Sequence, residues 1–145
     1  MTGVQTCALP ILERIGDQAA NIAERAQMLK DTPEISLPID IQEMGEKAGV
    51  MIRTAIQALL EADPKMAEAV LSMDDEVDDM NRAVHAELVE VMQQHPQVSV
   101  QALNAILISR NLERSGDHAT NIAEDVIFWL RGSDVRHRMS LAEAD

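Results

Sequence analysis

The sequence of 145 residues has very little of several residue types, and each shortage excludes a class of structure. The single cysteine, Cys7, excludes an internal disulfide and a cysteine-ligated zinc site, so we expect a reducing compartment. Aromatic residues are limited to Phe128 and Trp129, which means that the core must be aliphatic. No apolar run reaches the roughly 20 residues that a membrane-spanning helix needs. We therefore expect a soluble protein without a membrane span.

Basic residues are also scarce, and this bounds the partners. The chain has 12 Lys and Arg against 25 Asp and Glu, a formal net charge of −13. Such a surface does not favour nucleic acid, because binding to phosphates depends on basic side chains that release counterions. It favours cations or basic surfaces instead. The sequence has only six Gly and five Pro, and 46% of its residues are hydrophobic. This composition favours long helices over a β-sandwich or barrel.

The first ten residues differ in character from those that follow. The stretch MTGVQTCALP shows neither a basic segment followed by a long apolar run nor a helical period, so we do not expect a signal peptide. Pro10 then directly precedes a strongly helical segment that has no polar N-cap. We interpret residues 1–10 as a foreign or artefactual leader, and we expect residues 1–9 to pack against nothing.

Hydrophobic periodicity in the rest of the chain predicts four helices and an all-α fold. Apolar residues recur at alternating steps of three and four, as on the buried face of an amphipathic helix. Asp63 followed by Pro64 is typical of an N-cap and a first helical residue, His95-Pro96 of a turn, and Gly132 of a C-cap. The predicted helices span about 11–30, 39–62, 64–94 and 98–131.

The first and fourth predicted helices are copies of one motif. LERIGDQAANIAER, from Leu12, aligns with LERSGDHATNIAED, from Leu112, at an offset of 100 residues and with ten of fourteen positions identical. One period therefore spans the second, third and fourth helices, which makes the repeat unit a three-helix bundle. We expect residues 11–32 to be the last helix of an incomplete first repeat, 39–138 a complete second repeat and 139–145 a tail. Two helices of the first repeat are expected to be missing upstream.

Acidic residues four positions apart recur on three of the predicted helices. This spacing puts both carboxylates on one helix face, one turn apart. If the third and fourth helices form an antiparallel hairpin about the His95-Pro96 turn, residues at equal height have numbers that sum to 191. Asp78 then pairs with Glu113, and Asp74 with Asp117. The acidic pairs are Glu13 and Asp17, Asp74 and Asp78, and Glu113 and Asp117.

Four converging carboxylates repel one another, by about 4 kcal/mol per close pair at an effective dielectric constant near 20. Protons, Arg partners or metal ions are needed to offset this repulsion. Oxygen-only ligands suit Mg, Ca, Mn or Fe ions and not zinc. We therefore predict a metal site at Asp74, Asp78, Glu113 and Asp117. Weaker candidates are Glu13 and Asp17, as a half-site, and Asn121 and Glu124, as outer ligands.

The sequence also supports a structural interpretation of these acids. Arg110 and Arg114 lie three or four residues from Glu113 and Asp117, where ordinary intrahelical salt bridges would satisfy them. Runs of acids on helices are most often solvated faces. His118 is turned about 100° away from the acidic stripe, so we leave it out of the site.

The doubled LERIGD and LERSGD motifs, each followed by NIAE, the run MDDEVD and the ending WLRGSDVRHR closely resemble the PhoU family of phosphate-regulatory proteins. The resemblance covers nearly everything from Leu12 to Arg138. It implies two tandem three-helix bundles and metal clusters held by acidic motifs of this kind. It further implies a cytoplasmic, often dimeric negative regulator, which couples the high-affinity phosphate ABC transporter to a sensor histidine kinase.

Two other functions remain open from the sequence. A carboxylate-bridged metal enzyme of the di-iron bundle type would want Glu-x-x-His pairs, and the sequence has none. A plain helical scaffold with an acidic face needs no site at all. No nucleophile with a base and no Gly-rich phosphate loop is present, so we expect no enzymatic activity.

Overall fold

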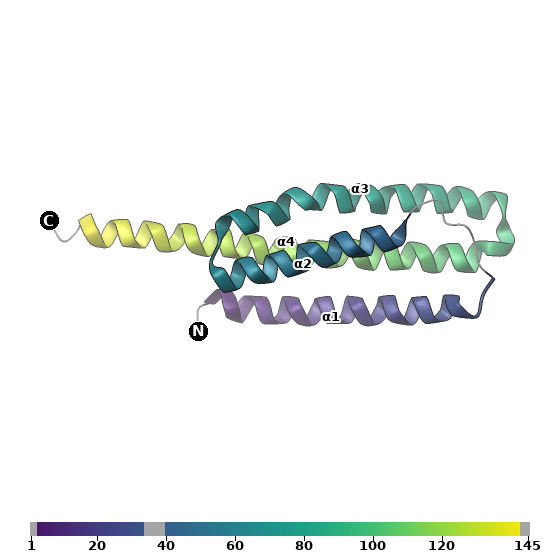
Figure 1. Cartoon of the computed structure of the whole chain (residues 1–145), viewed down its shortest axis with the longest axis horizontal. Helices are drawn as coiled ribbons and strands as arrows, with labels where there is room; N and C mark the ends of the chain where they lie inside the picture. The colour runs from purple at the N-terminus through teal and green to yellow at the C-terminus, as the bar shows by residue number, and fades with distance from the viewer. Residues whose placement is uncertain (1–2, 34–39, 143–145) are drawn as a thin grey trace.

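The computed structural model describes the backbone of residues 3–33 and 40–142 and the side chains of residues 7–33 and 40–132. It confirms the all-α prediction, since the described residues form helices and no strand. The elements, in chain order, are α1 (Gly3–Lys30), α2 (Ile41–Glu61), α3 (Pro64–Gln94), the short 3₁₀ helix η1 (Pro96–Val98) and α4 (Ser99–Ala142) (Figure 1).

The longest helix, α4, is the centre of the arrangement. It packs against α1, α2 and α3, and α2 and α3 also pack against each other. Helices α2, α3 and α4 thus form a three-helix bundle, and α1 lies antiparallel along α4 on one side of it (Figure 1). The last part of α4 continues beyond the bundle (Figure 1). The α3–α4 pair is the antiparallel hairpin that the His95-Pro96 turn predicts.

Local capping explains where α2 and α3 begin. The Asp40 side chain accepts a hydrogen bond from the Glu43 backbone N–H at 3.0 Å. Asp63 accepts hydrogen bonds from the Lys65 and Met66 N–H groups at 2.8 and 3.4 Å, and Pro64 occupies the first turn of α3. The predicted Asp63-Pro64 start is confirmed. A carboxylate at this position satisfies N–H groups that have no partner within the helix.

Two predicted helix ends are wrong. Helix α1 begins at Gly3 and runs through Pro10, although the predicted start was near Ile11. A proline removes one backbone hydrogen bond, and helical structure continues before it where packing compensates. Ala8 is 3% exposed, so the expectation that residues 1–9 pack against nothing is also wrong. Helix α4 continues past Gly132, which has no positive φ and is not a C-cap.

The core consists of two aliphatic clusters along the bundle. The first joins all three bundle helices, and α1 contributes half-buried residues to it. The second lies nearer the α3–α4 turn and contains Val84, Leu88, Ala102, Ala105 and Ile106. Large fully buried side chains of the first cluster are Met44, Met51, Val70, Val77, Ile122 and Val126.

A polar contact lies between these two clusters. The buried Ser109 hydroxyl donates a hydrogen bond to Asn81 Oδ1 at 2.7 Å, and its oxygen lies 3.4 Å from Met44 Sδ. Asn81 is on α3 and Ser109 on α4, so the bond fixes the register of the hairpin. A shift of either helix would leave a buried polar group without a partner, which costs about 1–3 kcal/mol.

Helix α1 is less securely packed than α4, and this leads to a prediction. Among its described side chains only Ala8 is buried, whereas α4 buries residues on most of its turns between Gln101 and Val126. We expect amide hydrogens of residues 12–29 to exchange faster than those of residues 104–126, because α1 packs mainly against α4 and opens locally. Native-state hydrogen exchange measures this. Equal protection in the two segments would show that α1 is as stable as the bundle.

Candidate metal centre

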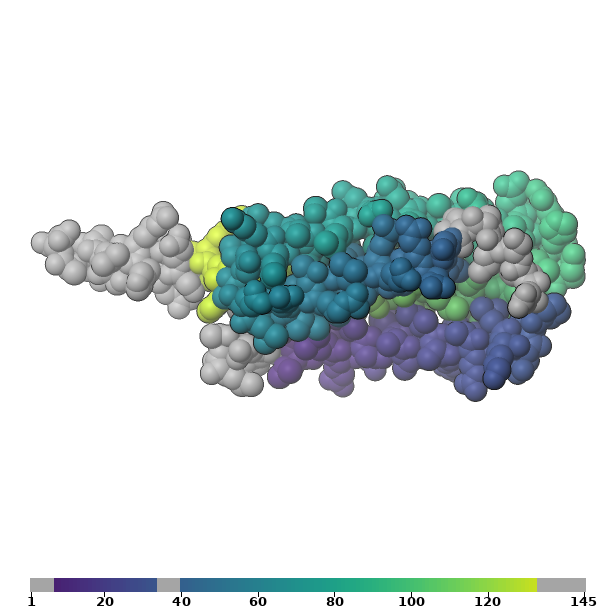
Figure 2. Space-filling model, in the orientation of Figure 1, coloured from purple at the N-terminus to yellow at the C-terminus, as the bar shows by residue number. Residues whose placement is uncertain are grey.

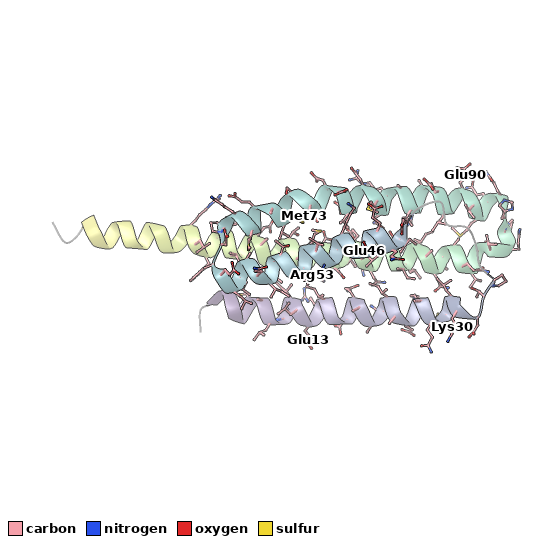
Figure 3. All side chains as sticks on the ribbon, in the orientation of Figure 1. Glu13, Lys30, Glu46, Arg53, Met73 and Glu90 are labelled. Carbon is pink, nitrogen blue, oxygen red and sulfur yellow. The ribbon has the colours of Figure 1, made fainter. Side chains whose placement is uncertain are left out.

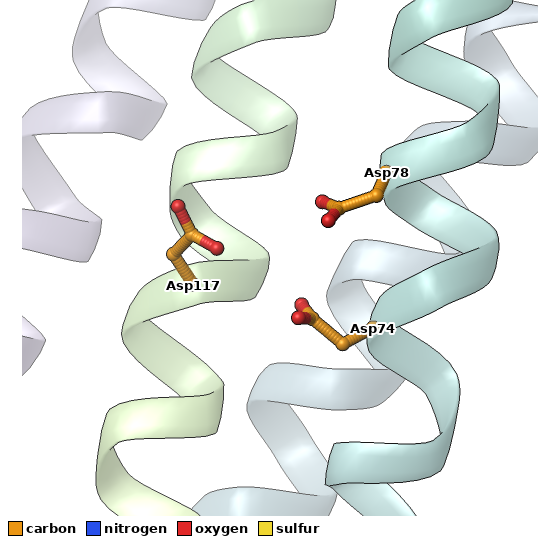
Figure 4. A group of neighbouring side chains, drawn as sticks. All are labelled: Asp74, Asp78 and Asp117. Atoms are coloured by element: carbon orange, nitrogen blue, oxygen red, sulfur yellow. The ribbon is translucent and has the colours of Figure 1, made fainter.

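Three of the predicted ligands converge between α3 and α4. Asp74 and Asp78 lie one turn apart on α3, and Asp117 lies on the facing side of α4 (Figure 4). Each offers one carboxylate oxygen, and these oxygens all lie within 4.8 Å of one another. The predicted approach of Asp74 to Asp117 is therefore confirmed. A single cation can contact three oxygens at this spacing.

Two oxygens of this group are buried without a hydrogen-bond partner. Asp74 Oδ1 and Asp78 Oδ1 are both inaccessible to solvent and accept no hydrogen bond from the described residues. Burial of an unsatisfied polar atom costs about 1–3 kcal/mol, and more when it is charged. Two carboxylate oxygens of the cluster are thus desolvated without a compensating hydrogen bond from the described residues.

The electrostatics of the cluster follow from burial and mutual repulsion. Burial raises the pKa of Asp74, and the negative charges of Asp78 and then Asp117 raise it further. Burial also raises the pKa of Asp78, followed by the charge of Asp117, while Arg82 opposes the change. Arg82 itself pairs with Asp79 at 3.0 Å. Both shifts have the direction that a bound cation would reverse.

Glu113 lies beside this group and is not one of the three residues that meet within 4.8 Å. Burial raises the pKa of Glu113, and the charges of Asp117 and then Asp78 add to the effect. Glu113 therefore belongs to the same electrostatic cluster as Asp78, its predicted partner. Glu113 is thus not one of the three converging residues, whereas the prediction treated all four acids as equal ligands.

Among the described side chains, the four acids form none of the salt bridges that the structural interpretation expected. Within the described side chains, ion pairs shorter than 4.0 Å join Lys47 to Glu43, Lys47 to Glu76 and Arg82 to Asp79. Neither Arg110 nor Arg114 forms one there. Arg114 acts only at longer range, where its charge slightly opposes the raised pKa of Glu113.

The weaker candidates lie outside the cluster. Glu13 and Asp17 are exposed on α1, and among the described side chains they are in no group of three potential ligands. Asn121 and Glu124 are exposed on α4. Glu124 still raises the pKa of Asp74 through its charge, as the smallest of several causes.

Sequence reasoning missed the Asn81–Ser109 hydrogen bond, which lies next to the cluster. Asn81 follows Asp78 by three residues and Ser109 precedes Glu113 by four, so both lie one turn further toward the hairpin end. Their numbers place them at nearly equal height about the turn. Their equal height about the turn could have revealed the pair, but the prediction from equal heights considered only acidic residues.

The mid-helix glycines have different surroundings. A Cβ at Gly116 would lie 3.5 Å from Met51 Cε and Sδ and 3.7 Å from Val77 Cγ1, which is ordinary contact. A Cβ at Gly16 would meet nothing within 4 Å. Close approach of α2 and α3 therefore excludes large side chains at Gly116, but the structure gives no reason for glycine at Gly16.

Comparison with known proteins gives one consistent result. The model of the PhoU domain family matches residues 41–126, which comprise α2, α3 and most of the bundled part of α4. The phosphate-specific transport system accessory protein PhoU homolog of Pseudomonas aeruginosa is 39% identical over 127 residues, 87% of this chain and 52% of that protein. The homolog of Deinococcus radiodurans is 33% identical over 126 residues, 87% of this chain and 59% of that protein.

A solved structure agrees with the sequence relatives. The crystal structure of PhoU from Pseudomonas aeruginosa matches with a TM-score of 0.84 and 35% sequence identity, over 89% of this chain and 62% of that one. The chain spans about half the length of the curated relatives that it matches.

Proposed function

Because the chain belongs to the PhoU family, we propose that it functions in an accessory protein of a phosphate transport system and binds hard cations at Asp74, Asp78 and Asp117. The main support for the cation site is one structural observation. Three carboxylate oxygens converge within 4.8 Å, and two buried oxygens of the same residues have no partner. A cation would satisfy these atoms and remove the repulsion between the three charges.

The donor set fits a hard cation. Carboxylate oxygens suit Mg²⁺, Mn²⁺, Ca²⁺ and iron ions, whereas zinc prefers sulfur and nitrogen ligands. Asp74, Asp78 and Asp117 would hold the ion, and Glu113 would stand next to it as a further acceptor. A bound ion would supply positive charge that links α3 to α4, and the protein residues would set the separation of the two helices.

The regulatory part of the proposal derives from the relatives. They are named as accessory proteins of phosphate transport, which supports association with a phosphate ABC transporter. We propose a cytoplasmic, dimeric negative regulator that also contacts a sensor histidine kinase, without enzymatic activity of its own. None of the described helices is both long and apolar enough to cross a bilayer.

The carboxylate-bridged enzyme is the second candidate, and the composition of the cluster disfavours it. The three convergent ligands are all aspartates, and no histidine joins them among the described side chains. Di-iron bundle enzymes combine carboxylates with histidines. Turnover of oxygen or peroxide by the iron-loaded protein would support an enzymatic function. Metal binding without such turnover would support a regulatory function.

A genetic test addresses the regulatory proposal. In a bacterium that lacks its own homolog and expresses phosphate-starvation genes constitutively, the chain should restore repression under high phosphate. An Asp78→Asn, Asp117→Asn variant should restore less, because it loses the cation site. A starvation-gene reporter and ³²P-phosphate uptake measure the two outputs. If the wild-type chain binds metal but changes neither output, the regulatory proposal is wrong for this chain.

The raised pKa values of Asp78 and Glu113 predict a pH dependence of stability without metal. Their ordinary pKa values are 3.8 and 4.5, and the folded state holds their protons to higher pH. The favourable contribution is therefore complete below the ordinary values and is lost as pH rises through the raised ones. An Asp78→Asn, Glu113→Gln variant should match wild type near pH ~4 and exceed its melting temperature increasingly toward pH ~7.

Thermal denaturation of both proteins in chelator, at several pH values, measures this difference. An exposed-site variant, Glu68→Gln, serves as the control and should follow wild type at every pH, because Glu68 lies outside the cluster. A variant that is less stable than wild type at neutral pH would mean that the charged acids are satisfied in the folded protein.

A further inference from the structure

A second polar feature lies between α2 and α3, apart from the acidic cluster. The two helices form much of the face turned toward the viewer in Figure 2. A groove of about 430 Å³ lies between them. Figure 3 shows two of its residues, Glu46 on α2 and Met73 on the neighbouring α3. The groove is lined by Glu43, Glu46, Lys47, Val50, Met73 and Glu76.

The spacing of the α2 residues makes the groove continuous. Glu43, Glu46, Lys47 and Val50 follow one another at steps of three, one and three, so they share one face of α2 over about two helical turns. Met73 and Glu76, three residues apart, form the facing wall on α3. The groove therefore has room along its length for about two turns of a docked helix.

Negative charge dominates the groove. Lys47 contacts Glu76 at 2.8 Å and Glu43 at 3.5 Å, which joins α3 to α2 and uses its single positive charge. Glu46 is exposed and accepts one long hydrogen bond, from Gln42 at 3.4 Å. Within the described side chains Glu46 has no ion-pair partner. Three carboxylates thus stand against one ammonium group, and Glu46 remains available to a cationic partner.

Apolar surface lies among these charges. Val50 is an apolar residue that is 41% exposed. Met73 is half-buried, with one side against the main core cluster and a place in the groove lining. An inorganic cation makes no use of such surface. A partner that gains from both features carries apolar and basic side chains at helical spacing.

We propose that the α2–α3 groove is a docking site for a basic amphipathic helix of a partner protein. Apolar side chains of that helix cover Val50 and Met73, and its Lys or Arg side chains pair with Glu46 and its acidic neighbours. Charge complementarity selects this occupant, because an anionic nucleic acid or lipid headgroup is repelled by the same carboxylates. The groove shares no residue with the Asp74, Asp78 and Asp117 cluster, so the two sites are separable.

The test uses the full chain and a labelled 18-residue peptide of leucine and lysine, arranged to form an amphipathic helix. Fluorescence anisotropy should show saturable binding, and methyl NMR spectra should show shifts concentrated at Met73 and Val50. Glu46→Lys should weaken binding about tenfold, since it places a like charge against the peptide lysines. Lys47→Gln should strengthen binding, because Lys47 is the one basic residue among the described residues that line the groove.

Matched controls separate docking from general attraction to an acidic protein. Glu90 resembles Glu46, because it is exposed on α3 and accepts one hydrogen bond from a helical neighbour, Gln94, at 2.9 Å, so Glu90→Lys makes the same charge change outside the groove. It should leave affinity within about twofold of wild type. The Asp78→Asn, Asp117→Asn variant should also retain binding, which makes this result independent of the metal site.

Five results would overturn the proposal. The first four are no binding of the peptide, equal losses for Glu46→Lys and Glu90→Lys, methyl shifts away from the groove, and equal binding of a control peptide with serine in place of leucine. The fourth would show a cation-attracting surface without a docking function. The fifth is loss of binding in the aspartate variant alone, which would assign the peptide to the acidic cluster.

Discussion

Addition of Mg²⁺, Mn²⁺ or Fe²⁺ to the metal-free chain should raise its melting temperature, at hundredfold excess over the dissociation constant, by about 5–10 °C. An ion that binds only the folded protein adds RT ln(1 + [L]/Kd), roughly 2.7 kcal/mol at that excess. The proposed ion site is formed by Asp74, Asp78 and Asp117, whose oxygens meet only when α3 and α4 are paired. Differential scanning calorimetry across a metal titration measures the gain.

Neutralising one acid on each helix should change stability in two opposite directions. Asp78→Asn with Asp117→Asn removes repulsion, so the metal-free variant should melt above wild type. It also removes two of the three proposed ligands, so the gain on adding metal should disappear. A control pair at exposed positions, Glu68→Gln with Glu90→Gln, should keep the full metal-induced gain.

Some results would contradict the metal site. If the double aspartate variant melts below wild type in chelator, then other groups satisfy these charges in the folded state. If the control pair loses the gain as well, the ion binds the general negative charge of the surface. Elemental analysis after dialysis then identifies any ion that stays bound to wild type.

Replacing Met51 by alanine should cost about 2–5 kcal/mol of unfolding free energy. Met51 is fully buried on α2 in the main core cluster, and its terminal atoms approach Gly116 of α4. Truncation leaves a cavity at the point where α2 and α4 meet, because a packed helical interior relaxes only partly. Urea denaturation monitored by circular dichroism gives the free energy.

Leu60 is the matched control for this prediction. It is on the same helix and about the same size, but it is 76% exposed. Leu60→Ala should change stability by less than about 0.5 kcal/mol. Similar losses at both positions would mean that the face of α2 turned toward α4 is not the one the structure gives.

Local signals in the sequence were sufficient for the helices and the repeat. Apolar residues at steps of three and four predict helices because one face must be buried, and Asp63-Pro64 predicts a helix start because it satisfies free N–H groups. The duplicated LERxGD motif indicated a three-helix unit and the family. Helical periodicity and caps depend on residues near one another in the chain, and the repeat is found by comparing two segments directly, so neither requires knowledge of the tertiary structure.

The sequence also located the acidic cluster, but not its membership. Helical spacing and equal height about the turn placed Asp74 opposite Asp117, and the structure agrees. The sequence alone, however, does not determine how far each helix is rotated about its axis or how far each side chain extends. Tertiary packing brings oxygens of Asp74, Asp78 and Asp117 within 4.8 Å of one another, whereas Glu113 is outside this group although it interacts with Asp117 and Asp78.

The tertiary structure alone decided the features that depend on neighbours distant in the chain. The lack of a helical period in residues 1–10 predicted a helix start near Ile11, yet α1 begins at Gly3, runs through Pro10 and buries Ala8. Val50 is an apolar residue of α2, but the packing of α2 against α3 and α4 leaves it 41% exposed, in a groove that Glu46 also lines. Sequence determines which face of a helix is apolar. Which part of that face is covered depends on the position of the adjacent helices, and only the packed structure fixes that.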